Sequence, residues 1–162
     1  MGAEKFFDIK YRVEGFKPGA VVVVATVRAL KHHGGVAKID LDKENLPALG
    51  NGFPNLLWHV ENVTSVFGLP VVVAINKFPT DSEAELALVK SKCKEIGVNV
   101  ALSEVWGKGG ALAKEVVRLA ENNSEPLRFV YPVEAGIEEK LSAIVQKVYR
   151  GKAVELIPLA CK

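Results

Sequence analysis

The sequence predicts an α/β fold in which helices cover a mostly parallel, Rossmann-like sheet of about four to five strands in a three-layer α-β-α arrangement. Short, continuous apolar runs of strand length alternate with longer segments whose apolar residues recur every three or four positions. Continuous apolar runs are typical of parallel strands buried on both faces, and the wider spacing is typical of amphipathic helices. Right-handed crossovers then place helices on both faces of the sheet.

Four segments have the composition of strands. Three are the apolar runs at residues 20–25, 71–75 and 98–102, and a shorter fourth covers residues 128–130. A further apolar stretch at residues 153–157 is either an extra strand or a docking arm. The predicted strands are therefore spread along the whole chain, with room for a helix between each pair.

Helical segments separate and flank these strands. An opening helix covers residues 5–11, and residues 46–55 are predicted to form an exposed loop because they include two prolines and two glycines. The resulting order, β-α-β-α-β-α-β-α, is typical of a doubly wound sheet. Apolar residues at helical spacing define the core-facing sides of the other helices: Leu56, Val60, Val63 and Phe67; Leu86, Val89, Cys93 and Ile96; Leu112, Val116 and Leu119; Ile137, Leu141, Ile144 and Val148.

Composition predicts a single globular domain over residues 1–162, because 49% of the residues are hydrophobic and can form one core. Lysine and arginine number 21 against 19 acidic residues, a net charge of +2. Nucleic-acid-binding domains carry a much stronger basic surface. We therefore expect no nucleic-acid partner.

Cysteine usage and the N-terminal residues predict a cytoplasmic protein. Cys93 and Cys161 have no metal-ligand spacing and are too few for a disulfide framework, as is typical of a reducing compartment. The opening residues MGAEKFF have no apolar signal core, and Phe6 stands where a myristoylation signal has Ser or Thr. No apolar run approaches the length of a membrane span, so no membrane segment is expected.

Polar side chains follow the ends of the predicted strands. Ligands of open α/β sheets bind beyond the carboxyl ends of the strands. Thr26 follows the first strand and Ser103 the third, while Asn76 and Lys77 follow the second within AINKFPTD, residues 74–81. These side chains are the first candidates for a binding site.

The end of that segment allows two interpretations. Thr80 is followed three residues later by Glu83, a spacing that fits a helix capping box, so Thr80 and Asp81 are equally consistent with a helix start that has no chemical role. The Asn-Lys pair resembles the base-reading Asn-Lys-x-Asp of GTPases, but Asp81 comes two residues too late for that motif. A guanine site is therefore not expected.

Two aromatic residues lie in the loops after adjacent strands. Phe78 and Pro79 follow the second strand, and Trp106 follows the third beside several glycines. Two rings at neighbouring strand ends could clamp a planar heterocycle, since offset stacking contributes about 0.5–1.5 kcal/mol per pair beyond area burial. Ordinary packing of both rings beneath their loops is the alternative, and the residues alone leave both open.

Phosphate binding has weak support in this chain. No Gly-x₄-Gly-Lys-Ser/Thr motif is present, and the dinucleotide fingerprint fails because its third glycine is missing. Gly107 begins the string Gly-Lys-Gly-Gly, residues 107–110, which could approach an anion at a helix N-terminus. Such a short glycine string supports only a candidate role for Gly107.

No catalytic residue or metal ligand is predicted. His32 and His33 are adjacent, so on a helix they point in different directions, and a C-terminal cap is the preferred interpretation. His59 is expected at a surface or boundary position. No order of Ser, His and Asp or of Cys and His supports nucleophilic catalysis.

Four segments together resemble one enzyme family. GAEKFFDIK (residues 2–10), AVVVVATVRALKHHGG (20–35), FGLPVVVAINKFPTD (67–81) and SEVWGKGG (103–110) are similar, in order, to formate–tetrahydrofolate ligase. The likeness extends from Gly2 to about Tyr149. Four separated matches are much more specific than one isolated motif.

The resemblance implies an ATP-dependent ligase of one-carbon metabolism that activates formate as formyl phosphate and transfers the formyl group to tetrahydrofolate. In that family the aromatic residues corresponding to Phe78 and Trp106 flank the pterin ring, and Pro79 would line the same pocket. ATP and Mg²⁺ belong to the full-length family. The implied pterin clamp coincides with the aromatic pair found from the strand ends.

Departures from the family lead to three hypotheses. Family members are several times longer, and their P-loop lies upstream of the matched portion, so we expect no turnover by this chain alone. The chain is then a piece of the ligase, one half of a split enzyme with a P-loop-bearing partner chain, or a non-catalytic folate- or nucleotide-binding module. Homo-oligomers are also expected, because the family assembles as oligomers.

Overall fold

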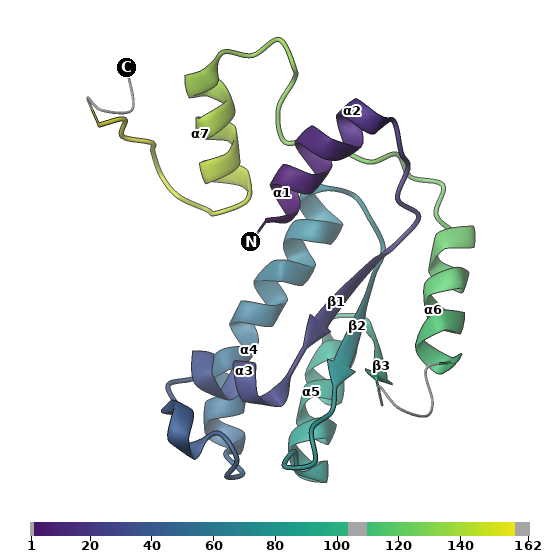
Figure 1. The fold of residues 1–162 in the computed structure, drawn as a ribbon, viewed down its shortest axis with the longest axis vertical. Coiled ribbons are helices and arrows are strands. Elements are labelled where there is room, and N and C mark those ends of the chain that lie inside the picture. The colour runs from purple at the N-terminus through teal and green to yellow at the C-terminus, as the bar shows by residue number, and fades with distance from the viewer. Residues whose placement is uncertain (1, 104–109, 158–162) are drawn as a thin grey trace.

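The computed structural model describes residues 2–103 and 110–157 and shows an α/β fold built on one parallel sheet (Figure 1). The sheet of these residues has three strands in the order β1-β2-β3, namely β1 (Val21–Ala25), β2 (Val71–Asn76) and β3 (Asn99–Ser103). The α/β class and the parallel sheet are thus confirmed. Each of these strands lies within one residue of its expected position.

The expected fourth and fifth strands are wrong. Residues 128–130 and 153–157 form no strand, so the described sheet has three strands rather than four to five. The N–H of Val130 donates to Asp8 Oδ1 at 2.7 Å, and only the N–H of Arg128 reaches a backbone oxygen, that of Phe67, at 2.9 Å. The Asp8 side chain therefore accepts the hydrogen bond from Val130 that a neighbouring strand would accept in a sheet.

Helices account for most of the remaining chain. The N-terminal segment is continuous through α1 (Ala3–Lys5), a π-helical stretch (Phe6–Tyr11) and α2 (Arg12–Glu14). The others are α3 (Val27–His33), a short 3-10 helix (Lys38–Asp40), α4 (Leu46–Glu61) with its π-helical continuation (Asn62–Val66), α5 (Glu83–Glu95), α6 (Gly110–Glu121) and α7 (Ile137–Lys147). Across the described ranges, no helix combines the length and apolarity that a membrane crossing requires.

Both faces of β2 are covered. Val71, Val73 and Ile75 belong to the main core cluster, together with side chains of α4 and α5. Val72 and Ala74 point to the opposite face, where α6 packs against β2 and β3, and they are 0% and 1% exposed. Burial on both faces explains why β2 is an unbroken apolar run rather than an alternating one.

The predicted loop at residues 46–55 is wrong, because α4 begins at Leu46. Pro47 lies in the first turn, where a helix needs no N–H donor, and Asn45 caps that turn by accepting a hydrogen bond from the N–H of Ala48 at 3.0 Å. Gly52 faces α3, where it allows the two backbones to approach closely. Pro and Gly here begin and pack a helix instead of breaking it.

The N-terminal segment is attached to the rest of the fold through Asp8 and Arg12. Arg12 Nη2 donates to the carbonyl oxygen of Tyr131 at 2.7 Å, and its guanidinium lies 3.9 Å from the ring centroid of Phe129. Arg12 also pairs with Asp8 at 3.3 Å. Burial raises the pKa of the Asp8 carboxyl, and the hydrogen bonds from Val130 and Arg12 offset this only in part.

Asp8→Asn should change how stability depends on pH. Because its pKa is raised in the folded state, Asp8 contributes most to stability below its unfolded pKa of 3.8, and that contribution falls as pH rises through the folded pKa. The variant lacks this titration and so does not lose this contribution. The unfolding free energy of the variant minus that of the wild type should therefore increase as pH rises from about 4 to 7. Urea denaturation across this range measures the difference, and Glu121→Gln on exposed α6 controls for the lost charge. A constant difference would contradict the prediction.

Candidate functional site

The carboxyl ends of the three strands lie at one edge of the sheet, at the lower end of Figure 1. The register places Ala25 beside Ile75 and Asn76 beside Ser103. Thr26, which follows β1 directly, is therefore level with the ends of the other strands. The structure thus brings the sequence-predicted residues of three separate loops to a common edge, as a parallel sheet requires.

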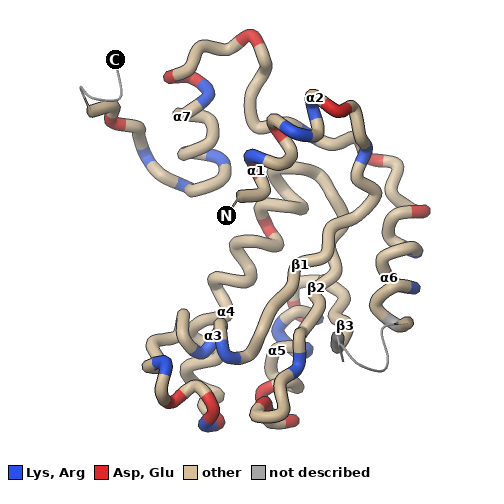
Figure 2. The backbone as a smooth tube through the Cα atoms, viewed as in Figure 1, with Lys and Arg blue, Asp and Glu red and all other residues tan. Residues whose placement is uncertain are grey.

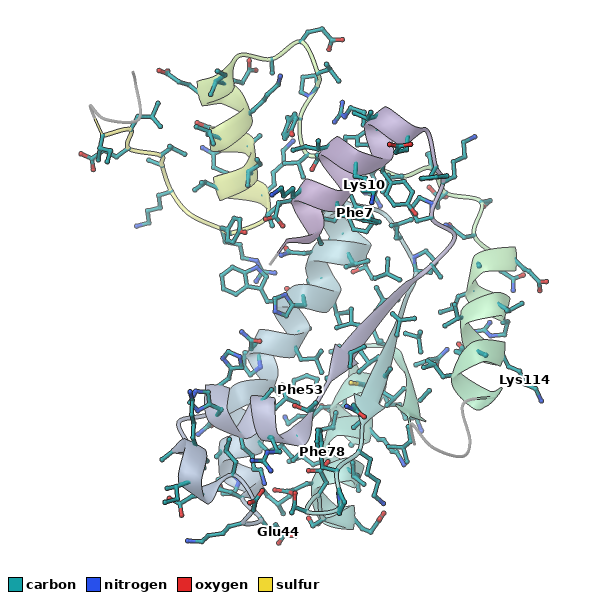
Figure 3. All side chains as sticks on the ribbon, in the orientation of Figure 1. Phe7, Lys10, Glu44, Phe53, Phe78 and Lys114 are labelled. Atoms are coloured by element: carbon teal, nitrogen blue, oxygen red, sulfur yellow. The ribbon has the colours of Figure 1, made fainter. Side chains whose placement is uncertain are left out.

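The loop after β2 presents Phe78 at this edge. Phe78 is 36% exposed, and the neighbouring Pro79 is also exposed. The N–H of Phe78 donates to Asp81 Oδ2 at 2.8 Å, and the N–H of Asp81 donates to the carbonyl oxygen of Phe78 at 3.0 Å. Figure 3 shows Phe78 in the lower part of the molecule, well below Phe7. A reciprocal pair of hydrogen bonds therefore fixes the backbone that carries an exposed aromatic ring.

The predicted capping role of Thr80 and Asp81 is wrong. Asp81 is buried and closes the Phe78 turn, while Thr80 is exposed in that turn. The capping box starts two residues later, where the Ser82 hydroxyl accepts from the N–H of Glu85 at 3.2 Å and Glu85 Oε2 accepts from the N–H of Ser82 at 3.1 Å. The Ser-x-x-Glu spacing of these residues was visible in the sequence.

A buried ion pair that the sequence analysis missed lies behind this loop. Lys31 Nζ of α3 is 2.9 Å from Glu85 Oε1, and both side chains are 0% exposed. Lys31 also donates to the carbonyl oxygen of Lys43 at 2.9 Å, and Glu85 Oε1 accepts from the N–H of Asn45 at 3.0 Å. Burial opposes ionisation of Glu85, yet the hydrogen bonds from Lys31, Asn45 and Ser82 hold its pKa below the usual value. The pair therefore joins α3, the chain before α4 and the start of α5.

Two of the polar candidates at this edge, Thr26 and Lys77, and the nearby Arg28 have structural partners. The Thr26 hydroxyl accepts from the N–H of Ala29 at 3.1 Å and so caps α3. Lys77 Nζ lies 2.7 Å from Glu83 Oε1, and Arg28 is paired with Asp42. Hydrogen bonding from Lys77 lowers the pKa of the Glu83 carboxyl. These contacts orient the loop and the starts of α3 and α5.

Two candidates cannot be placed. Trp106 and Gly107 lie outside the described residues, which end at Ser103 and resume at Gly110. The backbone of Ser103 is nevertheless fixed at the end of β3 by its pairing with Asn76. Of the two aromatic residues proposed from the sequence to form a clamp, the structure describes the position of Phe78 but not that of Trp106.

The histidines support no metal site. α3 ends at His33, and His32 Nδ1 lies 3.0 Å from the carbonyl oxygen of Val36, which agrees with the expected role at the helix end. His59 is half-buried on α4, where burial lowers the pKa of its imidazole. Within residues 2–103 and 110–157, no three His, Cys, Asp or Glu side chains form a group suited to a metal ion.

The structure thus places an exposed aromatic residue on a hydrogen-bonded loop at the carboxyl edge of a parallel sheet, the edge at which open α/β sheets bind ligands. The family model for formate–tetrahydrofolate ligase matches residues 1–162. The chain belongs to the formate–tetrahydrofolate ligase family. That family uses tetrahydrofolate, formate and ATP. The ligase segment FGLPVVVAINKFPTD, residues 67–81, contains all of β2 and the loop that carries Phe78.

Proposed function

We propose that this chain supplies the pterin pocket of a formate–tetrahydrofolate ligase at the carboxyl edge of its sheet. Phe78 stacks on one face of the pterin, Trp106 covers the other face, and Pro79 lines the side. Asn76, Lys77, Thr26, Ser103 and Gly107 are the other residues that we propose to bind folate. The observation that carries this proposal is that Phe78 is exposed while its N–H and its carbonyl oxygen are both hydrogen-bonded to Asp81.

The geometry of the Phe78 loop favours binding because hydrogen bonds within the loop hold the backbone of Phe78 in place. An exposed aromatic ring loses little further conformational freedom on stacking when its backbone is already fixed by two hydrogen bonds. Asp81 supplies both bonds, one through its carboxylate at 2.8 Å and one through its own N–H at 3.0 Å. Preorganisation of this kind is what a stacking platform needs for affinity.

Phosphoryl transfer is not assigned to these residues. The sequence contains no Gly-x₄-Gly-Lys-Ser/Thr motif, and the nearby cations Lys77 and Arg28 are directed to Glu83 and Asp42. Transfer of a phosphoryl group needs positioned cations and backbone donors around the phosphates. We therefore propose that the chain binds the folate ring, whereas ATP and Mg²⁺ are bound by a P-loop-bearing region or partner chain.

Phe78→Ala tests the pocket. Loss of one stacking face should weaken tetrahydrofolate binding by about 1–3 kcal/mol, a rise in Kd of about 5- to 150-fold. Isothermal titration of tetrahydrofolate into the wild type and the variant measures it. Phe16→Ala is the matched control, because Phe16 is 64% exposed and lies before β1, at the other end of the sheet. Equal affinity in wild type and Phe78→Ala would refute the clamp.

Activity measurements separate the remaining hypotheses. The purified chain is expected to bind tetrahydrofolate without formate-dependent ATP hydrolysis. Addition of a P-loop-bearing partner that restores formyl transfer would identify a split ligase, while binding that no partner makes productive would identify a folate-binding module. Turnover by the chain alone would contradict the proposed division of roles.

A further inference from the structure

The buried ion pair of Lys31 and Glu85 binds backbone groups from two separate loops. Lys31 Nζ donates to the carbonyl oxygen of Lys43 at 2.9 Å. Glu85 accepts from the N–H of Asn45 at 3.0 Å through Oε1 and from the N–H of Ser82 at 3.1 Å through Oε2. Because Lys43 and Asn45 precede α4 and Ser82 precedes α5, the pair connects the starts of these two helices.

Glu85 holds the chain directly beside the turn that carries Phe78. Besides accepting from the N–H of Ser82, it donates its own N–H to the Ser82 hydroxyl at 3.2 Å. The residue before Ser82 is Asp81, whose carboxylate and N–H bind the two backbone groups of Phe78 at 2.8 and 3.0 Å. Adjacent residues share a planar peptide group, so the position of Ser82 constrains that of Asp81. A continuous series of contacts therefore leads from Lys31 to the exposed Phe78.

The pair is buried, although charges are costly to bury. Figure 2 shows basic and acidic positions around α3 and α5 in the lower part of the molecule. Three pairs of this region lie nearer the surface: Arg28 with Asp42, Lys43 with Asp40, and Lys77 with Glu83. Lys31 and Glu85 are instead 0% exposed, and two well-packed apolar side chains of similar volume would often stabilise a core at least as well. Apolar side chains cannot bind three backbone groups, so these hydrogen bonds are what the pair contributes beyond packing.

We propose that Lys31 and Glu85 are positioning residues for tetrahydrofolate binding, which hold the chain beside Asp81 and so fix the orientation of Phe78. The inference rests on the proposed function and extends it to a pair that lies behind the pocket. Both side chains are 0% exposed, so they act without contacting the ligand. A stacking ring contributes most to affinity when the residues that support it are themselves held in place.

Calorimetric titration of tetrahydrofolate tests the proposal with a variant that leaves the pocket residues intact. Lys31→Met should raise Kd by about 3- to 30-fold, the usual range for a residue that acts on a site without touching its ligand. In the Phe78→Ala background the same substitution should leave Kd unchanged, because the ring that it positions is absent. A residue with its own contact to folate would weaken binding in both backgrounds.

Two further variants separate positioning from loss of stability. Phe67→Ala removes a core side chain that is 0% exposed and precedes β2, at the other end of that strand from Phe78, so it should leave Kd nearly unchanged. Lys31→Met/Glu85→Gln leaves no charge buried without a partner and is the variant to use if Lys31→Met does not fold. Its Kd should still be raised, because Glu85 accepts through both oxygens and the amide nitrogen of glutamine cannot accept.

The outcomes distinguish this inference from the pocket itself. If Phe78→Ala leaves Kd unchanged, the pocket is refuted, and this inference with it. If Phe78→Ala weakens binding but the Lys31 variants do not, or if they weaken it equally in the Phe78→Ala background, this inference alone is overturned. Binding by Phe67→Ala as weak as that by Lys31→Met would also overturn it, because loss of stability would then account for the effect.

Amide hydrogen exchange tests the same role without a ligand. The amides of Phe78 and Asp81 should exchange at least about threefold faster in Lys31→Met/Glu85→Gln than in the wild type. The amide of Gly97, which donates to the carbonyl oxygen of Lys94 at the far end of α5, is the internal control and should exchange equally in both proteins. Equal exchange of Phe78 and Asp81 in the two proteins would overturn the proposal.

Discussion

Lys31→Met should lower the free energy of unfolding by about 3–5 kcal/mol, the usual cost of removing one partner from a buried ion pair. The substitution retains the length of the side chain but leaves Glu85 without its cation at a position that is 0% exposed. It also removes the donor that the carbonyl oxygen of Lys43 uses at 2.9 Å. Urea denaturation followed by circular dichroism measures the loss.

The double variant Lys31→Met/Glu85→Gln should recover part of that loss. Without the carboxylate no unpaired charge remains buried, so the two substitutions should couple by about 1–3 kcal/mol in a double-mutant cycle. Arg118→Met is the control, because Arg118 forms an exposed pair with Glu115 on α6 and its loss should leave the denaturation midpoint almost unchanged. Additive single effects at Lys31 and Glu85 would show that the two charges do not depend on each other.

The same pair should give the unfolding free energy a defined pH dependence. The pKa of Glu85 is lowered in the folded protein, so its contribution is present above the unfolded value of 4.5 and is lost as pH falls through the folded pKa. Lys31→Met removes one of the hydrogen bonds that lower this pKa. The variant should therefore lose less stability than the wild type as the solution is acidified.

Strands and their order along the chain could be predicted from the sequence because burial on both faces leaves a distinct pattern. β2 is an unbroken apolar run whose first five residues are all buried. The segment 128–130 is shorter and contains Arg128 beside two apolar residues, and its N–H groups at Arg128 and Val130 donate to the backbone of Phe67 and to Asp8. The composition of a segment shows how apolar it is but does not show which groups its N–H donors bind. The pattern alone therefore could not exclude a fourth strand.

The location of the candidate site could be predicted from the sequence, but the ion pair behind it could not. Parallel strands end at one edge, which places Thr26, Asn76 and Ser103 together without knowledge of any distance. Lys31 and Glu85 are far apart in the sequence, although each lies four residues from a buried valine of its own helix, Val27 in α3 and Val89 in α5. Their contact depends on how α3 and α5 pack, which no local pattern encodes.

Residues 46–55 show how tertiary packing can reverse a local interpretation. Two prolines and two glycines predict a loop, yet Pro47 falls in the first turn and Gly52 at the crossing with α3. A Cβ at Gly52 would overlap the carbonyl oxygen of Leu30, and one at Gly34 would overlap that of Ala48. Two helices can approach this closely only where each has a glycine, so the residue type that weakens the isolated helix is required by its packing.

Gly52→Ala should consequently destabilise the fold by about 3 kcal/mol, the upper end of the usual cost of overpacking, because the added methyl meets backbone that cannot rotate away. Gly50→Ala should have the opposite sign. Its Cβ would meet only Lys92 Cε at 4.0 Å, and alanine is about 0.5–1 kcal/mol better than glycine inside a helix. Denaturation of both variants separates packing from helix propensity, since the residues lie two positions apart in α4. If both stabilised the protein, the close crossing of α3 and α4 would be wrong.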